Sequence, residues 1–209
     1  MKMYKKVMAA ALAGVMTVSM SATAFAADDD GYILKATNED SKSSDNDLVI
    51  AIEGSVSSMD PANIPDTNAI SATRGVYETL VSFDENQELT GKLAESWEVS
   101  DDSLTYTFKL RQGVKFQDGT DFNAAAVKAN YDRVVNKDNN LRQRRTFIVT
   151  NEDGSETPRV DSIETPDDYT LVIKLTQAWA PFINRLTQFC IISPAALEEY
   201  GNDIMNQPC

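Results

Sequence analysis

The side chains that could carry out acid–base chemistry in this chain are mainly carboxylates, because its 209 residues include no histidine. Histidine is the commonest general base and zinc ligand, so serine–histidine and cysteine–histidine nucleophile pairs are excluded within these residues. An exported hydrolase that works with two carboxylates is an alternative that the composition leaves open. The two cysteines, Cys190 and Cys209, could pair in an oxidising compartment, but their spacing and neighbours do not indicate a metal site. We therefore predict no metal and no cofactor.

The charge of the chain is strongly acidic, with 32 Asp and Glu against 19 Lys and Arg. Nucleic acid is therefore not expected as a partner, since binding a phosphate backbone needs clustered Lys and Arg. The triplet Asp28-Asp29-Asp30 lies in a polar stretch, 27–47, whose composition predicts a disordered acidic leader. The triplet lacks the alternating ligand spacing of an EF-hand loop, so we do not predict a calcium site there.

The first 26 residues predict export. A basic start is followed by an apolar run over 7–18 and by Ala24-Phe25-Ala26, the small-x-small pattern that signal peptidase cuts. The apolar run is too short to span a bilayer of about 30 Å. No cysteine lies near the cleavage site, so a lipid anchor is not expected. We predict that the chain is cut after Ala26 and is periplasmic.

The elements that must position any site begin with residues 48–52, an apolar run that suits a strand buried on both faces. The loop that follows carries Met59-Asp60-Pro61. Residues spaced as in a helix recur over 67–79, where Thr67 or Asn68 could cap the first turn. Residues 80–83 then predict a further strand.

Two antiparallel hairpins are predicted from alternating apolar residues. In the first, residues 96–110 alternate around the turn Asp101-Asp102-Ser103. In the second, residues 160–164 and 170–175 flank the turn Pro166-Asp167-Asp168. Strands and helices are mixed without strict βαβ alternation, so we expect a mixed α/β fold with an antiparallel part.

The firmest helix prediction follows Asn123, which can cap it. Its apolar residues share one face that we expect to pack in the core: Val127, Tyr131, Val134 and Val135. A short strand over 114–116 is expected before this helix. The polar stretch 136–158 predicts a long exposed excursion, and Pro181 and Pro194 could each start a short helix.

One segment is long and ordered enough to resemble a known family. Residues 93–120 closely resemble the hallmark segment of family 5 bacterial extracellular solute-binding proteins, the dipeptide, oligopeptide, nickel and glutathione receptors of ABC importers. Met59-Asp60-Pro61 and residues 121–130 and 192–197 support the resemblance. Within the family, residues 116–130 are most similar to glutathione-binding and dipeptide-binding members. The hallmark segment itself is explained best as a structural hairpin.

The resemblance implies a periplasmic-binding-protein type II fold, in which two lobes close on a ligand. Residues 48–209 would be a partial first lobe, with a core of 48–79 and 180–209 around an antiparallel hairpin subdomain of about 80–179, and the second lobe would be absent. The implied function is capture of a small peptide, dipeptide or glutathione-like, and its delivery to the membrane subunits of an ABC permease. The protein would not be an enzyme, and it would be monomeric when full length. A truncated, non-functional half-domain that exposes its cleft face is a further alternative.

The resemblance also implies where a ligand would bind. In peptide-binding members the loop after the first strand, here 63–68, lines one wall of the cleft. The candidate ligand-binding residues are therefore Pro65, Asp66, Thr67 and Asn68, whose backbone groups and short polar side chains could orient a ligand. Capping of the following helix by Thr67 or Asn68 is an equally supported role, and the two roles can coexist.

Arginines are weaker candidates. Arg74 could meet a ligand carboxylate through two hydrogen bonds, although an arginine on a helix surface is more often solvated. Arg142, Arg144 and Arg145 would suit an anionic peptide such as glutathione, but a charged run in a polar excursion is usually just exposed. We expect Phe189 and Cys190 to pack in the core.

Overall fold

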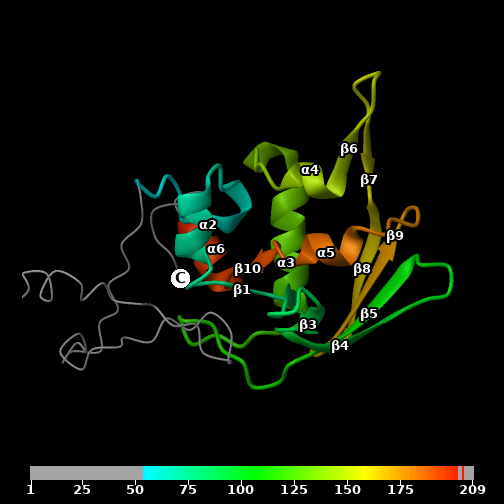
Figure 1. Ribbon diagram of the computed structural model, residues 1–209, viewed down its shortest axis with the longest axis horizontal. Helices are drawn as coiled ribbons and strands as arrows, with labels where there is room; N and C mark the ends of the chain where they lie inside the picture. The colour runs from blue at the N-terminus through cyan, green and yellow to red at the C-terminus, as the bar shows by residue number, and fades with distance from the viewer. Residues whose placement is uncertain (1–53, 202–203, 205–209) are drawn as a thin grey trace, which may run out of the picture. The chain divides into compact units, whose positions relative to one another are not determined.

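The computed structural model describes residues 54–201 and residue 204 (Figure 1). Every described residue belongs to one compact unit of the chain, residues 52–209. The predicted signal peptide, the acidic leader, the strand over 48–52 and Cys209 all lie outside the described residues. The described part of the chain contains no helix with the length and apolar content that a membrane crossing requires.

A four-stranded antiparallel sheet, in the order β4-β5-β9-β8, contains both predicted hairpins (Figure 1). Its strands are β4 (Ala94–Val99), β5 (Thr105–Leu110), β8 (Val160–Asp167) and β9 (Thr170–Leu175). The second turn lies slightly later than predicted, because β8 continues to Asp167. The hairpins are joined through β5 and β9, where Phe108 lies opposite Leu171 and Tyr106 lies opposite Ile173.

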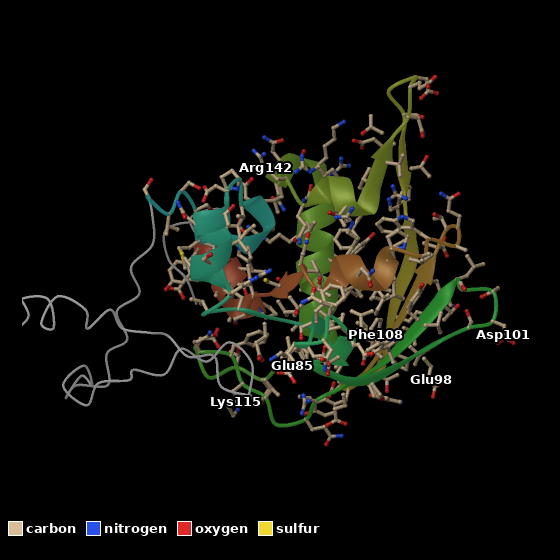
Figure 2. The ribbon with its side chains drawn as sticks, viewed as in Figure 1. Glu85, Glu98, Asp101, Phe108, Lys115 and Arg142 are labelled. Atoms are coloured by element: carbon tan, nitrogen blue, oxygen red, sulfur yellow. The ribbon has the colours of Figure 1, made fainter. Side chains whose placement is uncertain are left out.

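The alternation of apolar residues determines which face of the sheet is buried. Phe108 and Leu171 are completely buried and Tyr106 nearly so, because every second residue of β5 and β9 points to the same side. Tyr106 also packs edge-on against Phe182, with ring centroids 4.8 Å apart. Figure 2 shows Phe108 between the sheet and the helices, whereas Glu98 lies at the surface.

Helix α3 (Ala124–Val135) confirms the firmest sequence prediction. The side chain of Asn123 caps it by accepting a hydrogen bond from the amide of Ala126 at 2.9 Å. Val127 and Val134 of the predicted stripe are buried, and Tyr131 packs on the same core.

The prediction of a long exposed excursion over 136–158 was only partly right: residues 150–158 are exposed, but most of the stretch has regular structure. This stretch forms η3 (Lys137–Asn139), α4 (Arg144–Phe147) and the hairpin β6 (Ile148–Thr150) and β7 (Glu156–Pro158). Phe147 is 1% exposed, and its ring lies 5.3 Å from those of Tyr131 and Phe189. Phe147 is followed by Ile148 and Val149, and an apolar run this short does not distinguish a helix from a strand or a loop.

Short elements complete the described part. The helices predicted after Pro181 and Pro194 are α5 (Phe182–Leu186) and α6 (Pro194–Tyr200). β1 (Glu78–Thr79) pairs antiparallel with β10 (Cys190–Ile191), and β2 (Val81–Phe83), the strand predicted over 80–83, pairs with β3 (Leu89–Gly91).

Two local predictions need correction. The strand over 114–116 is reduced to an isolated bridge between Lys115 and Asp121. The helix over 67–79 is shorter than predicted: after the single turn η2 (Pro61–Asn63), α2 (Thr67–Thr73) ends before β1 begins. After Thr73 the chain turns through residues 74–76, where the amides of Gly75 and Val76 bond to the carbonyls of Ala72 and Thr73.

Candidate functional site

The candidate ligand loop, which in the structure extends the predicted residues 63–68 back to residue 57, is organised by two carboxylates that each begin a helical turn. Asp66 begins α2: its Oδ1 accepts a hydrogen bond from the amide of Ala69 at 2.9 Å, and the hydroxyl of Ser57 donates to its Oδ2 at 2.5 Å. The cap of α2 is thus Asp66, and the prediction that Thr67 or Asn68 caps it was wrong. Three consecutive residues could each have capped the helix, and the sequence does not reveal which one precedes the first helical amide.

The Asp66 carboxylate is held in its charged form. The hydroxyl of Ser57 and, to a lesser degree, the amide of Ala69 lower the pKa of Asp66 below its ordinary value. Both donors hydrogen bond to the ionised oxygens, so protonating the carboxyl would weaken them. Any ligand that reaches this turn therefore meets a fixed negative charge.

The four sequence-predicted residues lie together at the start of α2, with different exposure. Pro65 and Thr67 are exposed, whereas Asp66 and Asn68 are half-buried. The side-chain amide of Asn68 lies close to Gly54. A Cβ added at Gly54 would lie 2.7 Å from the Nδ2 of Asn68. The surface that this turn presents is therefore formed mainly by the Pro65 ring and the Thr67 side chain.

Sequence reasoning missed the residues that hold this loop in place. Asp60, only 2% exposed, accepts a hydrogen bond from the amide of Ala62 at 2.9 Å and so begins η2. It also accepts two hydrogen bonds from the guanidinium of Arg133 on α3, at 3.2 and 2.6 Å. An Asp directly before a proline that starts a helical turn is a signal for a cap. Nothing local signals a partner 73 positions away.

The motifs that carry the resemblance contact one another. The side chain of Asn130 on α3 donates to the carbonyl of Ile192 at 2.7 Å and accepts from its amide at 3.0 Å. The next residue, Ser193, is completely buried; its hydroxyl donates to Asp118 and lies 3.2 Å from the hydroxyl of Thr120. The Ser193 hydroxyl is the main cause that lowers the pKa of Asp118. These polar residues join separate parts of the chain, so the motifs have a structural role.

The predicted arginines separate into two groups. Arg144 makes a bidentate ion pair with Glu156, with N–O distances of 2.7 and 2.8 Å, which raises the pKa of Arg144 and lowers that of Glu156. Arg142 and Arg145 are exposed, and Figure 2 shows Arg142 at the surface beside α4. The amide of the intervening Gln143 donates to the carbonyl of Ala62 at 3.0 Å, which ties this segment to η2.

A hollow of about 550 Å³ lies elsewhere, at one end of the four-stranded sheet. Its lining includes Glu95, Asp167 and Asp168 together with Lys109. The amide of Tyr169 and the hydroxyl of Thr170 lower the pKa of Asp167, which is the opposite of what a general acid needs. Among the described residues no group of three or more acidic or thiol side chains is placed to hold a metal ion.

Comparison with known proteins places the chain in a family. A sequence profile described as bacterial extracellular solute-binding proteins, family 5 middle, matches residues 88–208, more than half of the chain. The chain is 38% identical over 197 residues to the glutathione-binding protein GsiB of Shigella dysenteriae serotype 1, a match that covers 93% of this chain and 33% of GsiB. The chain thus spans about a third of the length of this relative.

Two solved structures support the mixed α/β fold of periplasmic binding proteins. The binding protein AgaA of A. tumefaciens R10, in complex with agropinic acid, is 28% identical with a TM-score of 0.62 over 74% of this chain and 29% of AgaA. DppA of Helicobacter pylori, in complex with the peptide STSA, is 29% identical with a TM-score of 0.58 over 73% of this chain and 33% of DppA. On the strength of the profile match, this chain belongs to the family 5 bacterial extracellular solute-binding proteins.

Proposed function

We propose that this chain provides the first-lobe wall of the substrate-binding component of an ABC importer, which captures small peptides of the dipeptide or glutathione type. The observation that carries the proposal is the likeness to a protein named glutathione-binding, which extends over 93% of this chain. The solved DppA structure adds a relative that holds a peptide. The protein would be periplasmic after cleavage behind Ala26, monomeric when full length, and would deliver its ligand to the membrane subunits of a permease.

The surface that we assign to the ligand is the turn at Pro65, Asp66, Thr67 and Asn68. The ionised Asp66 suits the ammonium group of a peptide, and the exposed Thr67 hydroxyl can both donate and accept a hydrogen bond. Two lobes that both contact the ligand only when the cleft is shut would shift toward the closed state on binding. In that mechanism this turn supplies one of the two contacting walls.

A titration followed by two-dimensional NMR tests the proposal, because it detects weak binding and locates it. Glutathione, dialanine, trialanine and nickel–histidine are added in turn to residues 27–209. We expect shifts at the amides of 65–70 with a peptide ligand, and affinity reduced by about threefold to tenfold in Thr67→Ala through loss of one hydrogen bond. Thr90→Ala, an exposed threonine on β3, is the matched control and leaves affinity unchanged. Absence of shifts at 65–70 with every ligand would refute the proposal.

A further inference from the structure

A buried ion pair connects α3 to the candidate ligand loop. The side chains of Arg133 and Asp60 are 10% and 3% exposed, and their closest N–O distance is 2.6 Å. Both guanidinium NH₂ groups are used, one on each oxygen of Asp60, so the pair fixes an orientation as well as a distance.

Asp60 transmits this orientation to the backbone of the loop. Its Oδ1 accepts from the amide of Ala62, its carbonyl accepts from the amide of Asn63 at 3.0 Å, and its own amide donates to the hydroxyl of Ser58 at 3.1 Å. Asp60 therefore makes three hydrogen bonds within the few residues that precede Pro65, in addition to its ion pair with Arg133. The path of the chain into the ligand turn is determined at this residue.

Arg133 is itself held on a well-anchored helix. Asn130, one turn earlier on α3, binds both backbone groups of Ile192, and the side chain of Asn139 donates to the carbonyl of Arg133 at 2.8 Å. Residues three apart on a helix lie on the same side, so Asn130 and Arg133 fasten the same face of α3 to two different segments. The position of the loop is thereby fixed relative to α3, which is itself bonded to the segment at Ile192.

We propose that Arg133 is a positioning residue for the ligand wall: by holding Asp60 it sets the place of the turn at Pro65–Asn68 without touching the ligand. The inference rests on the proposed function, since that function assigns the turn to the ligand. Neutralising Arg133 leaves the Asp60 carboxylate buried and unpaired, and the loop is expected to open locally to hydrate it. Among the described residues, no hydrogen bond joins the four-stranded sheet to this pair. The strand pairing of the sheet is therefore expected to remain intact.

Amide hydrogen exchange on the chain measures this directly. In Arg133→Gln we expect the amides of the loop and of the first turn of α2, those of Ala62, Asn63, Ala69 and Ile70, to exchange at least about tenfold faster, and the amides of β5 and β9 to change by less than about twofold. Arg133→Lys keeps the charge but not the bidentate contact. The exchange rates of its loop amides should therefore lie between those of the unsubstituted chain and those of Arg133→Gln.

Arg159→Gln is the matched control. It removes another half-buried guanidinium, one that stacks 4.2 Å from the centre of the Trp179 ring, and leaves loop exchange unchanged. Equal acceleration in loop and sheet, or an unchanged loop in Arg133→Gln, would overturn the proposal. Should Arg133→Gln be insoluble, Arg133→Lys is judged by the same comparison.

A glutathione titration of the same proteins separates this inference from the proposed function. If the unsubstituted chain binds glutathione, we expect Arg133→Gln to weaken binding by at least about threefold while Arg159→Gln does not. A loosened loop with unchanged affinity would show that Arg133 does not position a ligand wall. If the unsubstituted chain binds no peptide, the proposed function fails, and the exchange data still decide whether Arg133 positions the turn.

Discussion

Replacing Asn130 by alanine should cost this protein much more stability than any surface amide. Asn130 is 2% exposed, and its side chain satisfies both the amide and the carbonyl of Ile192, a residue that is itself 1% exposed. Alanine leaves both backbone groups buried without a partner, at about 1 to 3 kcal/mol each. The third hydrogen bond, to the carbonyl of Ala126 at 2.9 Å, adds little because that carbonyl also lies within α3. We therefore expect a loss of about 2 to 6 kcal/mol.

Urea denaturation followed by circular dichroism measures this loss. With a slope of about 2 kcal/mol per M, the midpoint should fall by roughly 1 to 3 M. The control is Asn184→Ala, the same change at an exposed position on α5, for which we expect a difference within about 0.5 kcal/mol. A loss for Asn130→Ala no larger than that of the control would refute the reasoning, because it would show that the Ile192 groups do not need this amide.

Three further predictions concern buried rings and a thiol. Burial, with a smaller contribution from Asp132, raises the pKa of Tyr131 to about 12, so its contribution to stability is complete below pH 10 and is lost as the pH rises toward 12. Tyr131→Phe should remove that alkaline loss, at most about 2 kcal/mol once partial exposure is allowed for, as seen by thermal melts from pH 9 to 12. Phe147→Ala should cost about 3 to 5 kcal/mol in urea denaturation, since its ring fills the space between Tyr131 and Phe189; a loss below 1 kcal/mol would contradict that packing. Burial raises the pKa of the Cys190 thiol to about 11, and Arg74 partly offsets this effect. In Cys209→Ser at pH 8, a disulfide reagent should therefore modify Cys190 of the folded protein at least about tenfold more slowly than Cys190 of the protein unfolded in urea. Equal rates would show that the fold does not protect this thiol.

The sheet and the main helix could be predicted because their patterns repeat. Apolar and polar residues alternate along 104–110, and the stripe of α3 recurs at helical spacing behind a capping Asn123. Repetition over several residues outweighs any single misleading position. The length of α2 could not be predicted in the same way, because Tyr77 continues the helical spacing from Ile70 and is buried, yet lies beyond the end of the helix at Thr73.

The candidate site was only partly accessible from the sequence. The resemblance pointed to Pro65–Asn68, and the structure places these residues together at the start of α2. The residues that organise the loop, Asp60 and Arg133, interact across 73 positions, and long-range polar pairs have no periodic signature. Asn130 illustrates the same limit, since an asparagine in a helix is usually interpreted as a solvated residue until its partner, Ile192 directly after β10, is known.

The pairing of β1 with β10 has a consequence for how the chain folds. Thr79 lies opposite Cys190, so forming this short ladder closes a loop of roughly 110 residues, whereas each sheet hairpin closes only a few. Folding rates fall as the loops that must close grow longer. We therefore expect the hairpins β4–β5 and β8–β9 to form first and the pairing of β1 with β10 to form late. Until the residues near 190 are in place, the edge of β1 remains unpaired, so the two ends of this closure are the last parts of the described chain to gain their partners.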